Sequence, residues 1–112
     1  AGGTGVGVYQ AAKDAGVLAI GVDSNQNHIH PGTMLTSMMK RVDNAVYNAF
    51  TNIEPGISAL GLKENGVGWA LDENNAELVS DEMESKVEAI KAMIISGDIS
   101  VHDYMSDNAC TY

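Results

Sequence analysis

The apolar positions of this chain first follow a helical spacing and then a strand-like one. Small apolar residues recur about one helical turn apart from Val8 to Ala15, and Gly16 supplies a C-terminal stop. Residues 17–22 contain no polar side chain, which is typical of a strand buried on both faces of a parallel sheet. A helix followed by a buried strand indicates an α/β repeat.

A second α/β unit is expected next. Residues 23–32 are polar and end in Pro-Gly, which predicts a loop at the carboxyl end of the first strand. Residues 34–37 predict a short strand, and the spacing of apolar residues from Val42 to Ile53 predicts one face of a helix.

A β-hairpin is expected in the following segment. Asn65-Gly66 lies between the apolar segments 60–63 and 67–71, and Asn-Gly in that setting is a strong hairpin signal. The hairpin would carry Trp69.

The C-terminal part predicts a helix from Asp81 to Ser96. Ser80 supplies a capping hydroxyl, acidic residues fill the first turn, and Gly97 follows the last turn. Its apolar stripe consists of Met83, Val87, Ile90 and Ile94. Residues 98–112 are polar and are expected to fray.

Size and charge exclude several classes of partner. The 112 residues allow one domain at most. A net charge of −9, with no basic cluster larger than Lys40-Arg41, argues against nucleic acid and anionic membrane as partners. No apolar run approaches the length of a membrane span. Cys110 is the single cysteine, so no internal disulfide is possible.

A glycine-rich stretch opens the chain. Gly3, Gly5 and Gly7 follow the spacing G-x-G-x-G, which fits neither the dinucleotide fingerprint nor the P-loop. Such a stretch either brings backbone N–H groups close to a ligand or is a turn that needs glycine. In α/β proteins such loops follow a strand, so the chain is expected to be part of something larger.

No metal site or catalytic group stands out. His28 and His30 are best explained as solvent-exposed loop residues, with only the distant His102 as a further histidine. An acidic cluster is most simply a solvated face, with weak calcium binding as an alternative; it comprises Asp72, Glu73, Glu77, Asp81, Glu82 and Glu84. There is no nucleophile elbow or Cys/His pairing. We therefore expect neither an enzyme nor a cofactor.

Four stretches in order along the chain carry a family resemblance. They are A-G-G-T-G-x-G at the start, I-G-V-D-S-x-Q at 20–26, P-G-T-M-L-T-S-M-M-K-R-V-D at 31–43, and G-L-K-E-N-G-V-G at 61–68. Together they resemble the basic membrane protein family, the purine-nucleoside-binding lipoproteins that serve ABC transporters. The last helix, with I-I-S-G-D-I at 94–99, is also similar to that family's ending.

The resemblance implies part of a type I periplasmic binding protein fold. This α/β fold would show a parallel sheet flanked by helices, with a C-terminal β-hairpin and helix. Residues 1–79 would form the second lobe of a two-lobed protein. Residues 80–112 would form a C-terminal helix and tail that pack on the absent first lobe or on a partner chain, so that the stripe of this helix would otherwise be exposed.

The resemblance also implies a ligand site. Asp23 would bind ribose hydroxyls, and Lys40 would reach ribose or purine acceptors. Gly3 and Gly5 would offer backbone N–H groups, and Thr4 a hydroxyl contact. The alternatives are that Asp23 only caps a loop and that Lys40 is a solvated helix residue. Aromatic residues that would stack on the purine are not identifiable.

The function implied is capture of a purine nucleoside for an ABC transporter permease. The location implied is outside the cytoplasm, either periplasmic or membrane-anchored at the cell surface. Two alternatives remain open: a ligand-sensing regulatory module of the same fold, and a receptor fragment that binds no ligand and self-associates with a second copy.

Overall fold

The computed structural model describes residues 2–52 and 54–109. A single 3-10 turn, η1 (Gly2–Thr4), leads into α1 (Gly5–Ala15). As Gly16 predicts, α1 ends there: Gly16 has φ 66° and its N–H donates to the carbonyls of the last turn. Tyr9 on α1 is 3% exposed and belongs to the small buried core of the described residues.

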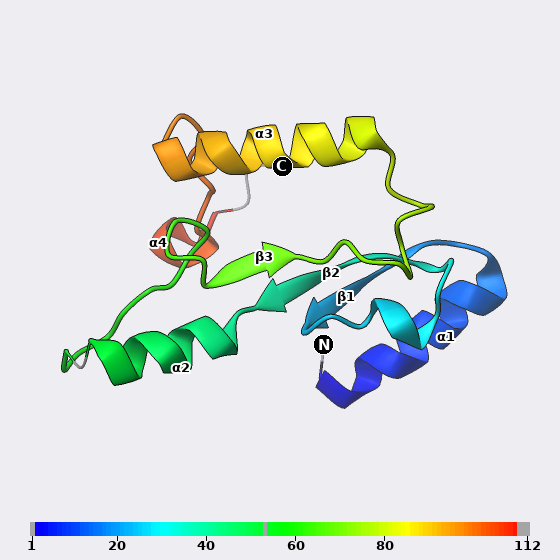
Figure 1. Ribbon diagram of the computed structural model, residues 1–112, viewed down its shortest axis with the longest axis horizontal. Helices are drawn as coiled ribbons and strands as arrows, with labels where there is room; N and C mark the ends of the chain where they lie inside the picture. The colour runs from blue at the N-terminus through cyan, green and yellow to red at the C-terminus, as the bar shows by residue number, and fades with distance from the viewer. Residues whose placement is uncertain (1, 53, 110–112) are drawn as a thin grey trace.

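A three-stranded sheet forms the centre of the fold (Figure 1). Its first two strands, β1 (Ala19–Asp23) and β2 (Met34–Lys40), are parallel, and a short 3-10 turn, η2 (Asn27–Ile29), lies in the loop between them. Figure 1 shows α1 below the sheet and α3 (Asp81–Ser96) above it. The α/β class expected from the sequence is therefore confirmed, and β2 extends three residues beyond the predicted strand.

The expected burial of the first strand on both faces is wrong in the described structure. Ile20 is 55% exposed, and Leu18, just before the strand, is 54% exposed. β1 is an edge strand of the sheet, and its main contacts in the described structure are with β2 and α1. An apolar strand therefore lies at the open side of this sheet, where a continuous apolar run alone cannot distinguish it from a central strand.

The expected pairing of residues 60–63 with 67–71 is also wrong. The strand β3 (Val67–Trp69) pairs antiparallel with β2 instead, with Lys40 opposite Val67 and Met38 opposite Trp69. The Asn-Gly signal specifies a closed turn, in which the Gly66 N–H donates to the carbonyl of Gly61 at 2.8 Å. The turn depends only on neighbouring residues. The strand that follows it pairs with β2, because β2 has a free edge there.

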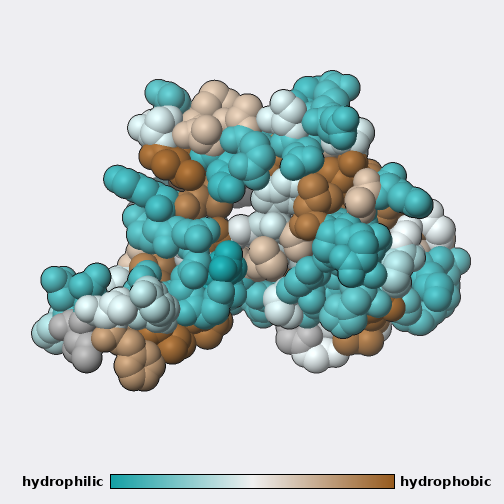
Figure 2. All heavy atoms as spheres, viewed as in Figure 1, coloured by the Kyte–Doolittle hydropathy of each residue, from teal (hydrophilic) through white to brown (hydrophobic). Residues whose placement is uncertain are grey.

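The helix α2 (Val42–Thr51) forms as predicted and projects at one end of the sheet (Figure 1). Its predicted apolar face is open, since Val42, Val46 and Phe50 are 63%, 50% and 80% exposed. Figure 2 shows apolar residues gathered on the lower face of this helix. Ile53, the last member of the predicted face, lies outside the described residues.

The C-terminal helix confirms the predicted cap and stop. The Ser80 side chain accepts from the Met83 N–H at 3.3 Å, and Gly97 has φ 88°. The stripe of α3 is partly open, with Val87 40% and Ile90 47% exposed. None of the helices in the described ranges is both long and apolar enough to cross a membrane.

The polar tail contains one further helical turn. α4 (Tyr104–Asp107) is capped by Asp103, whose side chain accepts from the Met105 N–H at 2.9 Å. The expectation that this segment only frays is wrong for these residues, because local side-chain capping orders them. Cys110 lies outside the described residues.

Candidate functional site

The carboxyl ends of β1 and β2 bring Asp23 and Lys40 together. Each is the last residue of its strand, and the two strands run parallel, so both side chains lie at the same edge of the sheet. Lys40 Nζ lies 2.8 Å from Asp23 Oδ1. The side chains are 61% and 51% exposed, so the pair faces solvent. Open α/β sheets bind ligands at this edge.

The Asp23 carboxylate has acceptor capacity to spare. Within the described residues its Oδ1 pairs with Lys40, and no hydrogen bond or ion pair engages Oδ2. An ionised carboxylate has about four lone-pair sites on its two oxygens. Asp23 also has φ 74°, a left-handed conformation that Asp and Asn tolerate better than most residues. The site therefore offers one open carboxylate oxygen beside one ammonium group.

The glycine-rich stretch forms the first turns of the chain. Gly3 and Thr4 are exposed, whereas Gly5 is buried, and a Cβ added at Gly5 would lie 3.1 Å from the hydroxyl of Tyr9. The N-terminal end of α1 lies beside the carboxyl end of β1 (Figure 1). Within the described part of the chain, no hydrogen bond or ion pair joins residues 3–5 to Asp23 or Lys40.

A second charged pair lies just beyond Lys40. Arg41 binds the Asp43 carboxylate through Nε and Nη2, with Nη2 to Oδ2 at 2.7 Å. The hydrogen bonds from Arg41 lower the pKa of Asp43 to about 2. Asp43 is exposed, as Asp23 is, and it is likewise paired with a basic side chain.

Buried polar side chains hold the loop after β1 in place through hydrogen bonds. Asn27 and Ser37 are both 0% exposed. Ser37 Oγ donates to Asn27 Oδ1 at 2.8 Å and accepts from the Gln26 N–H at 3.0 Å. Gly21 allows this approach, because a Cβ there would overlap the Ser37 hydroxyl.

Asp72 holds the same loop from the segment that follows β3. Its Oδ2 accepts from Asn25 Nδ2 at 2.6 Å and from Asn27 Nδ2 at 3.1 Å, while Oδ1 accepts from the backbone and side chain of Asn74. These hydrogen bonds, that from Asn25 first, lower the pKa of Asp72. Asn75, 0% exposed, accepts from the Asp72 N–H at 2.8 Å.

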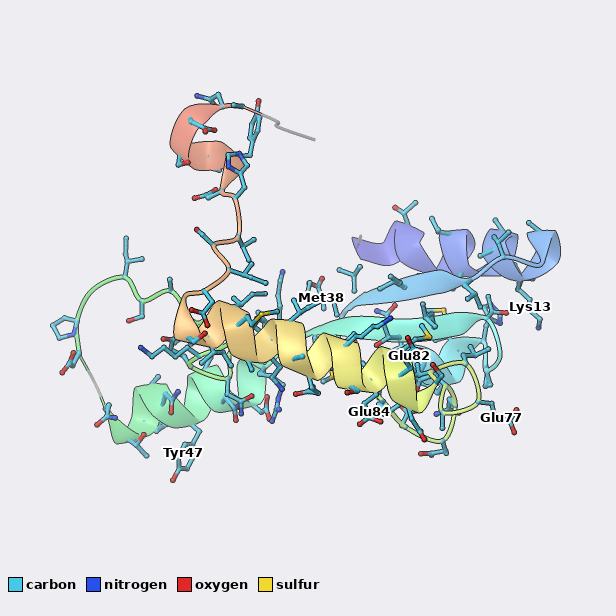
Figure 3. The ribbon with its side chains drawn as sticks, turned by 90° about the horizontal axis from the view of Figure 1, so that it is seen from above. Lys13, Met38, Tyr47, Glu77, Glu82 and Glu84 are labelled. Atoms are coloured by element: carbon cyan, nitrogen blue, oxygen red, sulfur yellow. The ribbon has the colours of Figure 1, made fainter. Side chains whose placement is uncertain are left out.

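The sequence predicts only an acidic surface cluster that includes Asp72, and not this network. The partners in the network are 45 to 47 residues apart, so no local pattern links them. The available signal was the density of amide side chains after two predicted strands, at 25–27 and at 74–75. The other acids behave as expected, since Glu77 and Glu84 point outward in Figure 3.

Trp69 links the sheet to α3. Its Nε1 donates to Glu88 Oε1 at 2.9 Å, and this bond, followed by that from Lys91, lowers the pKa of Glu88. Beside it lies an apolar cavity of about 290 Å³, lined by Met38 from β2 and Ile90 from α3 among others. The expectation that Trp69 serves in packing fits this position, although it belongs to β3 and not to a hairpin.

Metal ligands are not brought together in the described residues. No group of three or more His, Cys, Asp or Glu side chains there is placed to hold a metal ion. His28 is exposed on η2, and His30 follows that turn.

Comparison with known proteins places this arrangement in a family context. Residues 1–104 match the model of a family described as "ABC transporter substrate-binding protein PnrA-like". The chain is similar to basic membrane protein D of Borreliella burgdorferi (strain JD1), with 36% identity over 110 residues that cover 90% of this chain and 32% of that protein. An uncharacterized lipoprotein of Pyrococcus abyssi (strain GE5 / Orsay) is 44% identical over 84 residues, which cover 64% of this chain and 21% of the lipoprotein.

A solved structure supports the same relationship. The crystal structure of an ABC transporter solute-binding protein from Aeropyrum pernix K1 matches with a TM-score of 0.68 and 30% sequence identity. The match covers 88% of this chain and 38% of that one. The chain thus spans about a third of the length of the first of these relatives.

Proposed function

Because this chain belongs to the PnrA-like family of ABC transporter substrate-binding proteins, we propose that it contributes one side of a site that captures a purine nucleoside. Asp23 accepts hydrogen bonds from the ribose hydroxyls, and Lys40 donates to ribose or purine acceptors. The proposal includes delivery of the nucleoside to an ABC permease.

The observation that carries this proposal is the open Asp23–Lys40 pair at the carboxyl edge of the sheet. Two neighbouring ribose hydroxyls are donors, and a carboxylate is an acceptor-only group that can take both. The Lys40 ammonium group already lies at 2.8 Å, so a sugar bound to Oδ2 would lie within its reach. The exposed N-terminal turn with Gly3 and Thr4 is a candidate for further contacts, because it precedes the end of α1 that lies beside the carboxyl end of β1 (Figure 1).

The exposure of the pair supports a two-lobed site. A small-molecule site typically buries about 70–90% of its ligand, whereas both side chains of this pair are more than half exposed. We propose that residues 1–79 act as the second lobe and that a first lobe covers the nucleoside from the other side. Residues 80–112 are then the C-terminal helix and tail that pack against that lobe or a partner chain.

The names of the relatives support a cellular location for this protein. Two of them are named as a basic membrane protein and a lipoprotein. We propose that the protein works outside the cytoplasm, periplasmic or anchored at the membrane surface.

A second candidate, self-association without ligand, is favoured by the open apolar face of α2. Phe50 and Val46 on that face are 80% and 50% exposed. A native mass spectrum distinguishes the two: a nucleoside mass increment supports capture, and a bare dimer supports self-association.

The direct test compares Asp23→Asn with Asp43→Asn by titration calorimetry against guanosine, inosine and adenosine. Asparagine tolerates the positive φ of Asp23, so the substitution removes the charge without straining the backbone. Losing a charged hydrogen-bond partner costs about 1.5–3 kcal/mol, so the Asp23 variant should bind roughly 10 to 150 times more weakly. Asp43 is the matched control, because it is also paired with a basic side chain and exposed.

Dideoxynucleosides sharpen the test. If Asp23 accepts the ribose hydroxyls, removing those hydroxyls should weaken binding to the wild-type protein and have little further effect in the Asp23→Asn variant. Equal affinity of wild-type and Asp23→Asn protein for guanosine would refute the assignment of Asp23.

A further inference from the structure

We propose that Asp72 is a positioning residue for the nucleoside site, because through Asn25 and Asn27 it fixes the loop that presents the Asp23 carboxylate. This inference rests on the proposed function of Asp23. It assigns a positioning role to a residue from the segment that joins β3 to α3, far from Asp23 along the chain.

The bridge from Asp72 reaches the loop at two points. Asp72 Oδ2 accepts from Asn25 Nδ2 at 2.6 Å and from Asn27 Nδ2 at 3.1 Å. Asn25 Oδ1 in turn accepts from the Asn27 N–H at 3.0 Å, which closes the loop on itself. A carboxylate suits this place because it is acceptor-only and faces two amide donors.

The loop has little freedom once this bridge is made. Gln26, between the two bridged residues, donates its N–H to Ser37 Oγ at 3.0 Å and its side-chain amide to the Val22 carbonyl at 3.1 Å. Ser37 is 0% exposed on β2 and also donates to Asn27. Three consecutive residues, beginning two positions after Asp23, are therefore tied to the sheet or to Asp72.

Asp72 is itself held rigidly. Its N–H donates to Asn75 Oδ1 at 2.8 Å, and Asn75 is 0% exposed. The Asn75 amide donates to the carbonyls of Leu35 on β2 and Ala70 at 2.8 and 3.0 Å. The bridge thus connects the loop to a segment that is itself fixed to the sheet.

The consequence for ligand binding follows from the backbone of Asp23. This residue leaves β1 with φ 74°, so its side-chain direction depends on where the chain continues. If the loop after it is released, the carboxylate samples several orientations and only a fraction of molecules is competent to bind. The apparent affinity falls by that fraction.

The test uses three single variants and one double variant of the protein. Asp72→Asn replaces one of the two acceptor oxygens by a donor NH2, so the donors from Asn25, Asn27 and Asn74 can no longer all be satisfied. Asn25→Ala removes one of the two bonds of the bridge, together with the acceptor for the Asn27 N–H, and leaves Asp72 unchanged. Asn74→Ala is the matched control, because it removes a donor to the other Asp72 oxygen and leaves the loop untouched. The double variant Asn25→Asp/Asp72→Asn reverses donor and acceptor and keeps the net charge.

Two readouts are measured on each variant. In the ligand-free protein, amide hydrogen exchange of residues 24–27 should accelerate with Asp72→Asn and Asn25→Ala, stay unchanged with Asn74→Ala, and slow again in the reversed pair. Guanosine affinity should follow the same order, with a loss of roughly tenfold, which lies within the range for coupled neighbours. If the double variant recovers slow exchange and guanosine affinity, the hydrogen bond between positions 25 and 72 is responsible, and not the negative charge at position 72.

Each failure has its own meaning. Unchanged exchange in Asp72→Asn and Asn25→Ala, or faster exchange with unchanged guanosine affinity, would overturn the positioning role. If the wild-type protein binds no nucleoside, the proposed function fails, whereas the exchange data still decide whether Asp72 holds the loop. Should Asp72→Asn fail to fold, Asn25→Ala still tests the Asn25 side of the bridge.

Discussion

Gly21→Ala should destabilise the protein strongly, although it adds only one methyl group. A Cβ at this position would lie 3.0 Å from Ser37 Cβ and 3.2 Å from Gln26 Cβ, and it would overlap the Ser37 hydroxyl. Gly21 is buried between these neighbours on β1. The hydroxyl must therefore move, or β1 must shift away from β2.

The magnitude has two parts. Overpacking a well-packed interior costs about 1–3 kcal/mol. Moving the Ser37 hydroxyl also breaks its bonds to Asn27 Oδ1 and to the Gln26 N–H, and a buried polar group left unsatisfied costs about 1–3 kcal/mol. Because the two parts share one side chain they are not additive, and we expect a loss of about 2–4 kcal/mol in the free energy of unfolding.

The assay is urea unfolding followed by far-UV circular dichroism. Gly7→Ala is the matched control: Gly7 lies in α1, and a Cβ there meets nothing within 4 Å. Alanine in a helix interior is better than glycine by roughly 0.5–1 kcal/mol, so this variant should be more stable than wild type.

The overlap can be isolated by repeating Gly21→Ala in a Ser37→Ala background. Without the hydroxyl, the added methyl group should cost about 1 kcal/mol less than in the wild type, as expected for residues in direct contact. A Gly21→Ala variant as stable as wild type, or an equal penalty in both backgrounds, would refute the reasoning.

Two further predictions concern the carboxylates of Glu88 and Asp43, which lie outside the β1 loop. Glu88→Ala should shift the emission of Trp69, the single tryptophan, and destabilise the protein by about 1 kcal/mol, since it removes the hydrogen bond from Trp69 together with the exposed ion pair to Lys91. Glu84→Ala, one turn earlier, is the control, and identical spectra for both variants would contradict the link. Arg41→Gln should raise the pKa of Asp43 from about 2 toward its ordinary value. Because the folded pKa is lowered, the Arg41–Asp43 contribution is present above the unfolded pKa of about 3.9 and is lost as the pH falls through about 2. A carboxyl NMR titration measures this directly, and an unchanged Asp43 pKa in the variant would refute it.

Local signals predicted the elements of this fold well. Gly16 and Gly97 end their helices with positive φ, and Ser80 caps α3. Each of these features depends on a few neighbouring residues, so the sequence carries the information directly. The pairing of Val67–Trp69 with β2 could not be read in the same way, because the Asn-Gly turn specifies a reversal and not the partner of the next strand.

The candidate site likewise has a part that the sequence predicts and a part that it does not. Asp23 and Lys40 were expected from motifs, and the parallel strands bring them to 2.8 Å. The Asn27–Asp72 bond could not be predicted, because asparagines in a polar loop look the same whether they are solvated or buried. Only the return of the chain after β3 determines that Asn27 is 0% exposed.

The distribution of burial shows which part of the proposed nucleoside site this chain can preorganise. The polar side chains that support the loop, Asn27, Ser37 and Asn75, are all 0% exposed, whereas Asp23 and Lys40 remain more than half exposed. Orientation is therefore supplied by this chain, because buried, satisfied hydrogen bonds fix the loop before any ligand arrives. Exclusion of water from the ligand is not supplied here, and for a nucleoside at Asp23 it must come from a second surface. This arrangement would favour closure of the proposed first lobe over the ligand. The Asp23 carboxylate is already oriented, so the covering lobe would only have to bury the ligand and would not have to order the carboxylate.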